Sequence, residues 1–284
     1  MTPSAKRQAV EILAGEHGLS VRRACSAMRL ARAAYYRPPE PRVLRDQPVI
    51  DALHAVVAES SKWGFWKCFD RLRNLGRLWN HKRVHRVYCA LRLNLPRRTR
   101  RRVPKRVQYP LAAPPALNHT WALDFMTDTL YDGRRFRTLN VLDEGVREVL
   151  DIEVDTSLTG ERVIRVVERI AEWRGMPKAI RCDNGPELIS QVFVEWCQRH
   201  QIELRHIQPG KPNQNPFIER FNRTYRDEVL SAYLFEDLDQ VREITQGWIV
   251  RYNEKRPHDS LGGLPPAVFR QTKTAEISTL ELST

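Results

Sequence analysis

The stretch TWALDFMTD, residues 120–128, opens the part of the chain whose pattern decides the fold. Its apolar character predicts a strand, and the turn YDG separates it from a second predicted strand, RRFRTLNVLDE (residues 134–144). A third predicted strand, EVLDIEVDT (residues 148–156), follows at hairpin-like spacing. These three segments therefore predict strands that pair in sequence order.

Helices and short strands alternate after these three strands. The pattern predicts a helix at 159–175, a strand at 178–185, a helix at 190–201, a strand at 202–209 and a helix within 211–230. In the last helix Asn215 fits the N-cap and Pro216 the first helical position. This order is that of a ribonuclease-H-like α/β domain, although other three-layer folds share it.

Three acidic residues stand out by their positions. Asp124 lies inside the first strand, Asp183 lies at the C-terminal end of the short strand AIRC, and Glu219 lies in the first turn of the last helix. Two aspartates and a glutamate brought together repel one another unless a cation intervenes, which indicates a site for hard divalent ions such as Mg²⁺. From these residues alone, surface carboxylates with capping roles remain the alternative.

The helix that carries Glu219 has an apolar stripe. We expect the stripe to pack on the sheet, and it consists of Ile218, Phe221, Tyr225 and Val229. We expect Glu219, Asn222, Arg223 and Arg226 to face elsewhere.

Charge is unevenly spread along the 284 residues. Residues 1–110 hold 25 Lys and Arg against 7 Asp and Glu, a net charge of +18, which leaves −5 for residues 111–284 within the total of +13. A basic front joined to a mildly acidic back indicates that the front contacts a polyanion, of which nucleic acid is the best candidate.

We expect five regions in the chain. They are a helix-turn-helix-like segment (1–40), a second helical DNA-binding unit (41–95), a basic linker (96–115), a ribonuclease-H-like core (116–235) and a C-terminal helix and tail (236–284). The candidate DNA contacts of the front regions are Arg22, Arg23, Lys82, Arg83, Arg86, Arg97, Arg98, Arg100, Arg101, Arg102, Lys105 and Arg106. An ordinary helical bundle and a solvated linker are the alternatives.

Membrane and disulfide classes are disfavoured. No segment approaches the roughly 20 apolar residues of a membrane span, so we expect a cytoplasmic protein without a membrane partner. The five cysteines are scattered without a CxxC pair, which indicates reduced and mostly buried thiols. A zinc site at His81, His85 and Cys89, with Cys68 upstream, is the less favoured alternative.

Several blocks resemble one known family. CDNGPE (182–187), QPGKPNQNPFIERFNRTYRDEVL (208–230) and YNEKRPHDSLGGLPPAVF (252–269) resemble, in order, blocks of the DDE transposases of bacterial insertion sequences, with 35 residues between Asp183 and Glu219. The chain looks like the second-reading-frame product of the insertion-sequence-three family, which is related to retroviral integrase. RRACSAMRLARAAYYR (22–37) and NHKRVHRVY (80–88) look like its helix-turn-helix segments.

The resemblance implies roles for particular residues. Asp124, Asp183 and Glu219 are the implied catalytic ligands of two Mg²⁺ or Mn²⁺ ions, and Asn184 and Gly185 shape the turn after Asp183. Arg226 is the implied contact to element-end DNA, with Arg223 a weaker candidate. In the block Tyr252, Asn253, Arg256, Pro257 and His258, we favour a structural role over a DNA contact.

The resemblance also implies an activity and its partners. We expect a transposase, with an integrase-like core behind all-α helix-turn-helix-like segments, that cuts DNA and joins a 3′-hydroxyl to another phosphodiester. The implied partners are the element's inverted repeats, target DNA, further copies of the chain on paired ends, and an upstream-frame protein or fusion. A catalytically silent DNA-binding regulator and a structure-selective nuclease are the alternatives.

Three stretches depart from the family pattern. Pro216 stands where the family has a small residue, and Cys182 where it has a serine-like one, but neither change removes a ligand. GFWKCFDRL (64–72) is less basic than usual, which leaves the DNA contacts of the second unit open. Leucine-zipper heptads are missing from this sequence, so we expect it to be the catalytic portion of the working enzyme.

Overall fold

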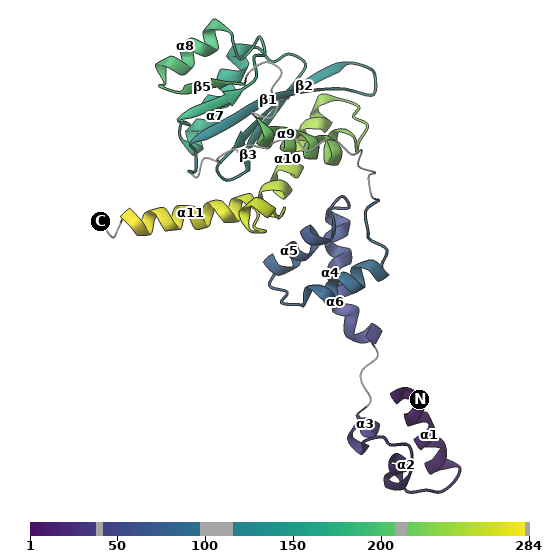
Figure 1. Cartoon of the computed structure of the whole chain (residues 1–284). Helices are drawn as coiled ribbons and strands as arrows, with labels where there is room; N and C mark the ends of the chain where they lie inside the picture. The colour runs from purple at the N-terminus through teal and green to yellow at the C-terminus, as the bar shows by residue number, and fades with distance from the viewer. Residues whose placement is uncertain (38–41, 97–115, 208–214, 282–284) are drawn as a thin grey trace, which may run out of the picture.

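A five-stranded mixed sheet forms the centre of the α/β core. The computed structural model describes residues 1–37, 42–96, 116–207 and 215–281 (Figure 1). The strands are β1 (Thr120–Thr129), β2 (Arg135–Asp143), β3 (Glu148–Asp155), β4 (Ala179–Cys182) and β5 (Glu203–His206). Their order is β3-β2-β1-β4-β5, with β1, β2 and β3 antiparallel and β4 and β5 parallel to β1. This topology is ribonuclease-H-like, which confirms the predicted fold.

Helices cover both faces of the sheet (Figure 1). The core helices are α7 (Gly160–Arg174), α8 (Gln191–Arg199), α9 (Pro216–Tyr225), the π-helix η2 (Arg226–Leu230), α10 (Leu238–Glu254), the 3₁₀-helix η3 (Asp259–Leu261) and α11 (Pro266–Glu281). Trp121 and Leu123 pack into the core that includes α7 and α8, and Ala122 and Met126 into the one that includes α9 and α10. Side chains alternate along a strand, so Asp124 faces α9.

Two small helical units precede the core. Their helices are α1 (Pro3–Gly15), α2 (Val21–Ala27), α3 (Arg32–Tyr36), α4 (Arg42–Glu59), α5 (Phe65–Asn74) and α6 (His81–Ala90). Each unit has its own buried cluster, one around Val10 and Ala24 and the other around Leu53 and Leu72. Asn80 caps α6 by accepting a 2.8 Å hydrogen bond from the Lys82 N–H, as predicted.

The second helical unit contacts the end of the core. The Asn74 amide donates to the Gly263 carbonyl at 2.9 Å, and the Lys255 ammonium lies 3.2 Å from the Glu59 carboxylate. Gly263 has a φ of +80°, and a Cβ placed there would lie 3.2 Å from Cγ of Asp70 on α5. A glycine at this position therefore permits both the turn and the close approach of α5.

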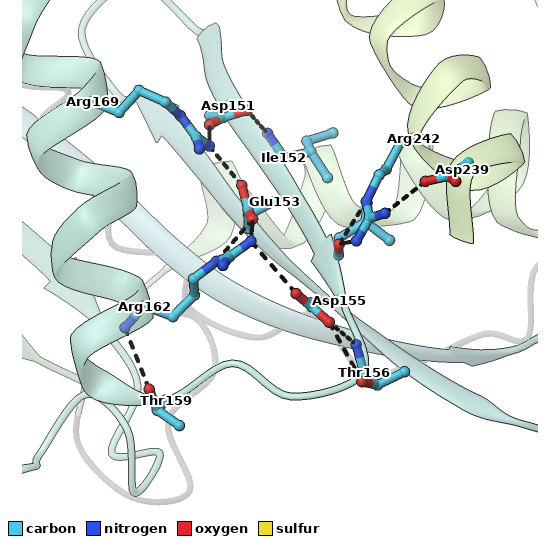
Figure 2. A network of polar contacts seen from close by, with 11 residues as sticks. Asp151, Ile152, Glu153, Asp155, Thr156, Thr159, Arg162, Arg169, Asp239 and Arg242 are labelled. Atoms are coloured by element: carbon cyan, nitrogen blue, oxygen red, sulfur yellow. Dashed lines mark hydrogen bonds and ion pairs between the residues drawn. The ribbon is translucent and has the colours of Figure 1, made fainter. Parts of the chain in front are cut away.

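Charged side chains cover the outer part of β3 (Figure 2). Arg169 on α7 bridges Asp151 and Glu153, and Arg162 bonds Glu153 and lies 3.5 Å from Asp155. On the α10 side the Arg242 guanidinium donates to the Val154 carbonyl at 3.0 and 3.2 Å. Ion pairs from α7 thus hold the carboxylates of this edge strand, and Arg242 of α10 occupies one of its backbone carbonyls.

The block Tyr252 to His258 joins α10 to the sheet. The Asn253 amide donates to the Val149 carbonyl at 2.8 Å, and the Val149 N–H donates to the Asn253 side chain at 2.9 Å. Tyr252 is buried in the core next to α9, and Arg256 forms an ion pair with Glu228. These contacts favour the structural role that the sequence suggested.

Membrane insertion has no candidate segment in the described ranges. Within them, none of the helices combines the length and apolar character needed to cross a bilayer.

Replacement of Asn253 tests this structural role. We expect Asn253→Ala to lower the free energy of unfolding by about 1–3 kcal/mol, because the Val149 N–H and carbonyl both lose their partner. Urea unfolding followed by tryptophan fluorescence measures the change. The control is Gln198→Ala at an exposed position of α8, where we expect almost no change. Equal midpoints for the two variants would contradict the structural role.

Candidate active site

Asp124 is a half-buried carboxylate in the middle of β1. Its two oxygens accept hydrogen bonds from the Phe125 N–H at 2.9 Å and from the Asn222 amide at 2.6 Å. Burial, together with the charges of Asp183 and Glu219 and against the two hydrogen bonds, raises the pKa of Asp124 to about 6. The negative charges of both other predicted carboxylates therefore act on Asp124.

Asp183 lies in the turn after β4. Its carboxylate accepts a 3.0 Å hydrogen bond from the Gly185 N–H, and the Asn184 amide donates to the Ile207 carbonyl at 3.0 Å. A Cβ on Gly185 would lie 3.0 Å from that same carboxylate oxygen. Asn184 and Gly185 thus shape the turn that presents Asp183, as the sequence suggested.

Glu219 lies in the first turn of α9. Asn215 occupies the N-cap position and Pro216 the first helical position, as predicted, and the Glu219 N–H donates to the Asn215 carbonyl at 3.2 Å. Burial raises the pKa of Glu219, and the nearby Arg223 opposes that rise. The Asn215 side-chain oxygen is buried without a hydrogen-bond partner in the part of the chain that the structure describes.

The apolar stripe of this helix is buried as expected, but one polar residue lies differently. Ile218, Phe221, Tyr225 and Val229 are all buried. We expected Asn222 to face away from the sheet, and this was wrong because its amide binds the Asp124 carboxylate. Glu219 and Asn222 are three residues apart and lie on one side of α9, which was the available signal.

A second amide orients Asn222. Asn140 is the β2 residue directly opposite Asp124, and its amide donates to the Asn222 side-chain oxygen at 2.7 Å. This bond fixes which end of Asn222 points at Asp124, since the oxygen is already occupied by a donor. Asn140 therefore orients Asn222 so that its amide N–H donates to the Asp124 carboxylate.

The donor set fits a hard divalent cation in kind and in charge. Three carboxylates come from three elements, and two of them have raised pKa values. Within the described ranges, however, no three His, Cys, Asp or Glu side chains converge into a group that can hold a metal. The carboxylates therefore lie near enough to repel one another but not in a closed coordination shell.

Arg223 and Arg226 follow Glu219 along the helix, and the charge of Arg223 acts on Glu219. Arg226 is the first residue of the π-helix η2, and its guanidinium donates to the Asp128 carboxylate at 3.1 Å and to the Thr127 carbonyl at 3.0 Å. Arg223, one turn earlier, is exposed. Both guanidinium groups thus belong to the turns of helix that follow Glu219.

Comparison with known proteins identifies the family. Two family models, both described as "Integrase core domain", match residues 114–212 and 200–266. The IS476 uncharacterized 39.2 kDa protein of Xanthomonas euvesicatoria is 38% identical over 273 residues, which cover 95% of this chain and 78% of the relative. The IS407 uncharacterized 31.7 kDa protein of Burkholderia multivorans is 36% identical over 88% of this chain and 90% of the relative. The chain belongs to the insertion-element transposases of the retroviral integrase superfamily.

Solved structures are more distant. The HTLV-2 integrase catalytic core domain in complex with magnesium (trimeric form) is 20% identical to this transposase, with a TM-score of 0.44 over 54% of this chain and 96% of that chain. The catalytic core domain of BIV integrase is 18% identical, with a TM-score of 0.43 over 56% of this chain and 99% of that chain.

The predicted DNA contacts of the transposase differ in their surroundings. Arg22, Arg23 and Lys82 are exposed. Arg83 and Arg86 both bind the buried Asp46 carboxylate, at 3.0 and 2.6 Å, so they join α6 to α4. Seven others lie outside the described residues: Arg97, Arg98, Arg100, Arg101, Arg102, Lys105 and Arg106.

The cysteines of the transposase are thiols. Cys25, Cys68, Cys182 and Cys197 are buried, and burial raises the pKa of Cys68 to about 11. The Cys89 sulfur lies 3.6 Å from Nε2 of His85, but Cys68 contacts the Trp63 carbonyl instead. The described residues therefore form no zinc site here.

Removal of the Asp124 charge should stabilise the metal-free transposase. A carboxyl with a folded-state pKa near 6 holds its proton more tightly than the unfolded chain does, so stability falls as the pH rises from about 4 to about 6. We expect Asp124→Asn to raise the free energy of unfolding above pH 6 by about 2–3 kcal/mol, and hardly at all below pH 4. Denaturant melts in EDTA across this pH range measure the effect.

The matched control is Asp132→Asn in the β1–β2 turn. The Arg134 N–H and guanidinium lower the pKa of Asp132, so loss of its charge should destabilise at neutral pH instead. The same stability difference between the wild type and Asp124→Asn at every pH would disprove the raised pKa of the Asp124 carboxyl.

Proposed function

We propose that this transposase binds the ends of its insertion element, nicks them to free a 3′-hydroxyl and joins that hydroxyl to another phosphodiester. The observation that carries this proposal is the half-buried Asp124 carboxylate, whose pKa is raised first by its removal from water and then by the charges of Asp183 and Glu219. Carboxylates that come from a strand, a turn and a helix and repel one another favour a divalent-ion site over a structural ion pair.

Asp124, Asp183 and Glu219 would hold two Mg²⁺ or Mn²⁺ ions. When bound, such ions supply Lewis acidity that activates water or a 3′-hydroxyl and stabilises the leaving oxygen. The protein's own part is to present the carboxylates. The Phe125 N–H and the Asn222 amide keep Asp124 oriented and favour its charged form.

Double-stranded DNA is the proposed partner, both as the element's inverted repeats and as target. The net charge of +18 on residues 1–110 supports phosphate binding by the two helical units and the basic linker. Arg226 and Arg223 extend the basic surface to the side of Glu219. We propose that copies of the chain act together on paired ends in the cytoplasm, with an upstream-frame protein or fusion as a further partner.

A strand-transfer assay tests the proposed activity. Labelled DNA carrying the repeats that flank the coding region is incubated with protein and Mg²⁺ or Mn²⁺. We expect Glu219→Gln to reduce nicked and joined product by at least about a thousandfold, because it removes a ligand charge and keeps the side chain's shape. DNA binding, measured by mobility shift, should persist.

The control is Glu161→Gln, which changes the equivalent first-turn residue of α7 and should leave the product unchanged. If neither the wild type nor Glu219→Gln makes product while both bind DNA, even with the upstream-frame protein, the protein is a DNA-binding regulator.

Replacement of Arg226 tests the DNA contact beside the carboxylates. We expect Arg226→Ala to weaken binding to the element's end and to reduce the slope of log affinity against log salt by about one. Fluorescence anisotropy across a salt series measures both. Arg165→Ala, at an exposed position of α7, is the control. An unchanged slope for Arg226→Ala would show that this arginine serves Asp128 rather than a phosphate.

A further inference from the structure

The turn between β2 and β3 is an anchored cluster of charges. Arg174 of α7 is buried and binds Asp143 at 3.0 Å and Glu148 at 2.8 Å. The Gly145 N–H donates to Asp143 at 2.8 Å, and a Cβ on Gly145 would lie 2.3 Å from the Ala116 carbonyl oxygen. Because ion pairs hold both ends of the turn and close packing holds its backbone, the side chains of the turn have well-defined positions.

Arg147 is the side chain that this turn directs at α9. Its φ of +58° lies in the left-handed region, which residues other than glycine seldom adopt. Its guanidinium carbon lies 3.5 Å from the centroid of the Phe217 ring, and the residue is only 9% exposed. A cation stacked on an aromatic face out of water is held more strongly than one at the surface.

The charge of Arg147 has few other partners. Its Nη1 is buried without a hydrogen-bond acceptor in the described ranges. Glu144, in the same turn, is fully buried and supplies the largest opposing charge. The ring of Phe217 therefore stabilises this guanidinium in place of a hydrogen-bond acceptor. Strained backbone such as that of Arg147 is found mostly at functional sites.

Phe217 lies two residues before Glu219, in the first turn of α9. Its ring packs on the core cluster beneath that helix. Phe217 also stacks on Arg147 of the β2–β3 turn, and Asn222 of the same helix bonds Asn140 and Asp124 of the sheet. Glu219 lies between them in the sequence, so both contacts set the place of its carboxylate.

We propose that Arg147 is a positioning residue for Glu219, and this rests on the proposed metal-dependent function. By holding Phe217, Arg147 keeps the first turn of α9 where Glu219 can join Asp124 and Asp183 on a divalent ion. The three carboxylates do not form a closed shell by themselves, so the setting of α9 governs how much rearrangement ion binding requires. Arg147 itself touches neither the ion nor DNA in this proposal.

Mn²⁺ affinity of the full chain, measured by isothermal titration calorimetry without DNA, tests this role. We expect Arg147→Ala to weaken Mn²⁺ binding about tenfold, and Phe217→Leu to weaken it similarly, because each removes one side of the stack. Arg147→Lys keeps a cation over the ring and should recover much of the affinity. Arg134→Ala, an exposed ion-paired arginine in the β1–β2 turn, should change nothing.

The double variant Arg147→Ala with Glu219→Gln separates positioning from general destabilisation. If Arg147 acts through Glu219, its loss costs no further Mn²⁺ affinity once the Glu219 charge is gone. Equal losses with and without Glu219 would overturn the proposal, as would full affinity in both Arg147→Ala and Phe217→Leu.

Two further results keep this test apart from the proposed function. Unchanged Mn²⁺ affinity in Glu219→Gln alone would reject the metal site itself, whatever Arg147 does. If Arg147→Ala does not fold, as judged by near-ultraviolet circular dichroism, Phe217→Leu and its double variant with Glu219→Gln decide the question by the same criterion.

Discussion

The partial burial of one carboxylate, that of Asp124, is the constraint on which the rest of the core depends. A charge inside a strand is tolerated only where hydrogen bonds or ions replace the water that it has lost. Here the Phe125 N–H and the Asn222 amide replace part of that water, while Asp183 and Glu219 oppose the charge. The metal-free core is thus arranged around an unfavourable group, as is common where a fold holds a reactive site.

Helix α9 reconciles this unfavourable group with a stable fold. One side of the helix buries Ile218, Phe221 and Tyr225 against the sheet, and this apolar burial stabilises the core. The adjoining side carries Glu219 and Asn222 toward the carboxylates. Because both sides belong to one rigid helix, the apolar contacts determine where the acidic and amide groups lie, and a shift of the helix changes packing and site together.

Sequence patterns predicted what depends on local order. The strand and helix order, the apolar stripe of α9 and the turn at Asn184 and Gly185 follow from periodicity, turn chemistry and resemblance. The direction of Asn222 and the contact of Arg147 with Phe217 were not predicted, because each joins residues far apart in the sequence whose meeting depends on strand register and helix rotation. The chemical role of the three carboxylates remains a prediction, since geometry alone places them near one another without a closed shell.

Several arginines that are candidates for DNA binding already form ion pairs with carboxylates of the protein. Arg83 and Arg86 share Asp46, and Arg226 binds Asp128. A guanidinium carries five donors in a fixed plane, so one carboxylate occupies only part of it and the remaining N–H groups can still meet a phosphate. The carboxylate restricts the rotamers of a long side chain, which would lower the entropy lost in the proposed contact with DNA. These arginines can therefore form an ion pair within the protein and a contact to phosphate at the same time. The acidic neighbours reduce the net positive charge, but they also orient the guanidinium groups.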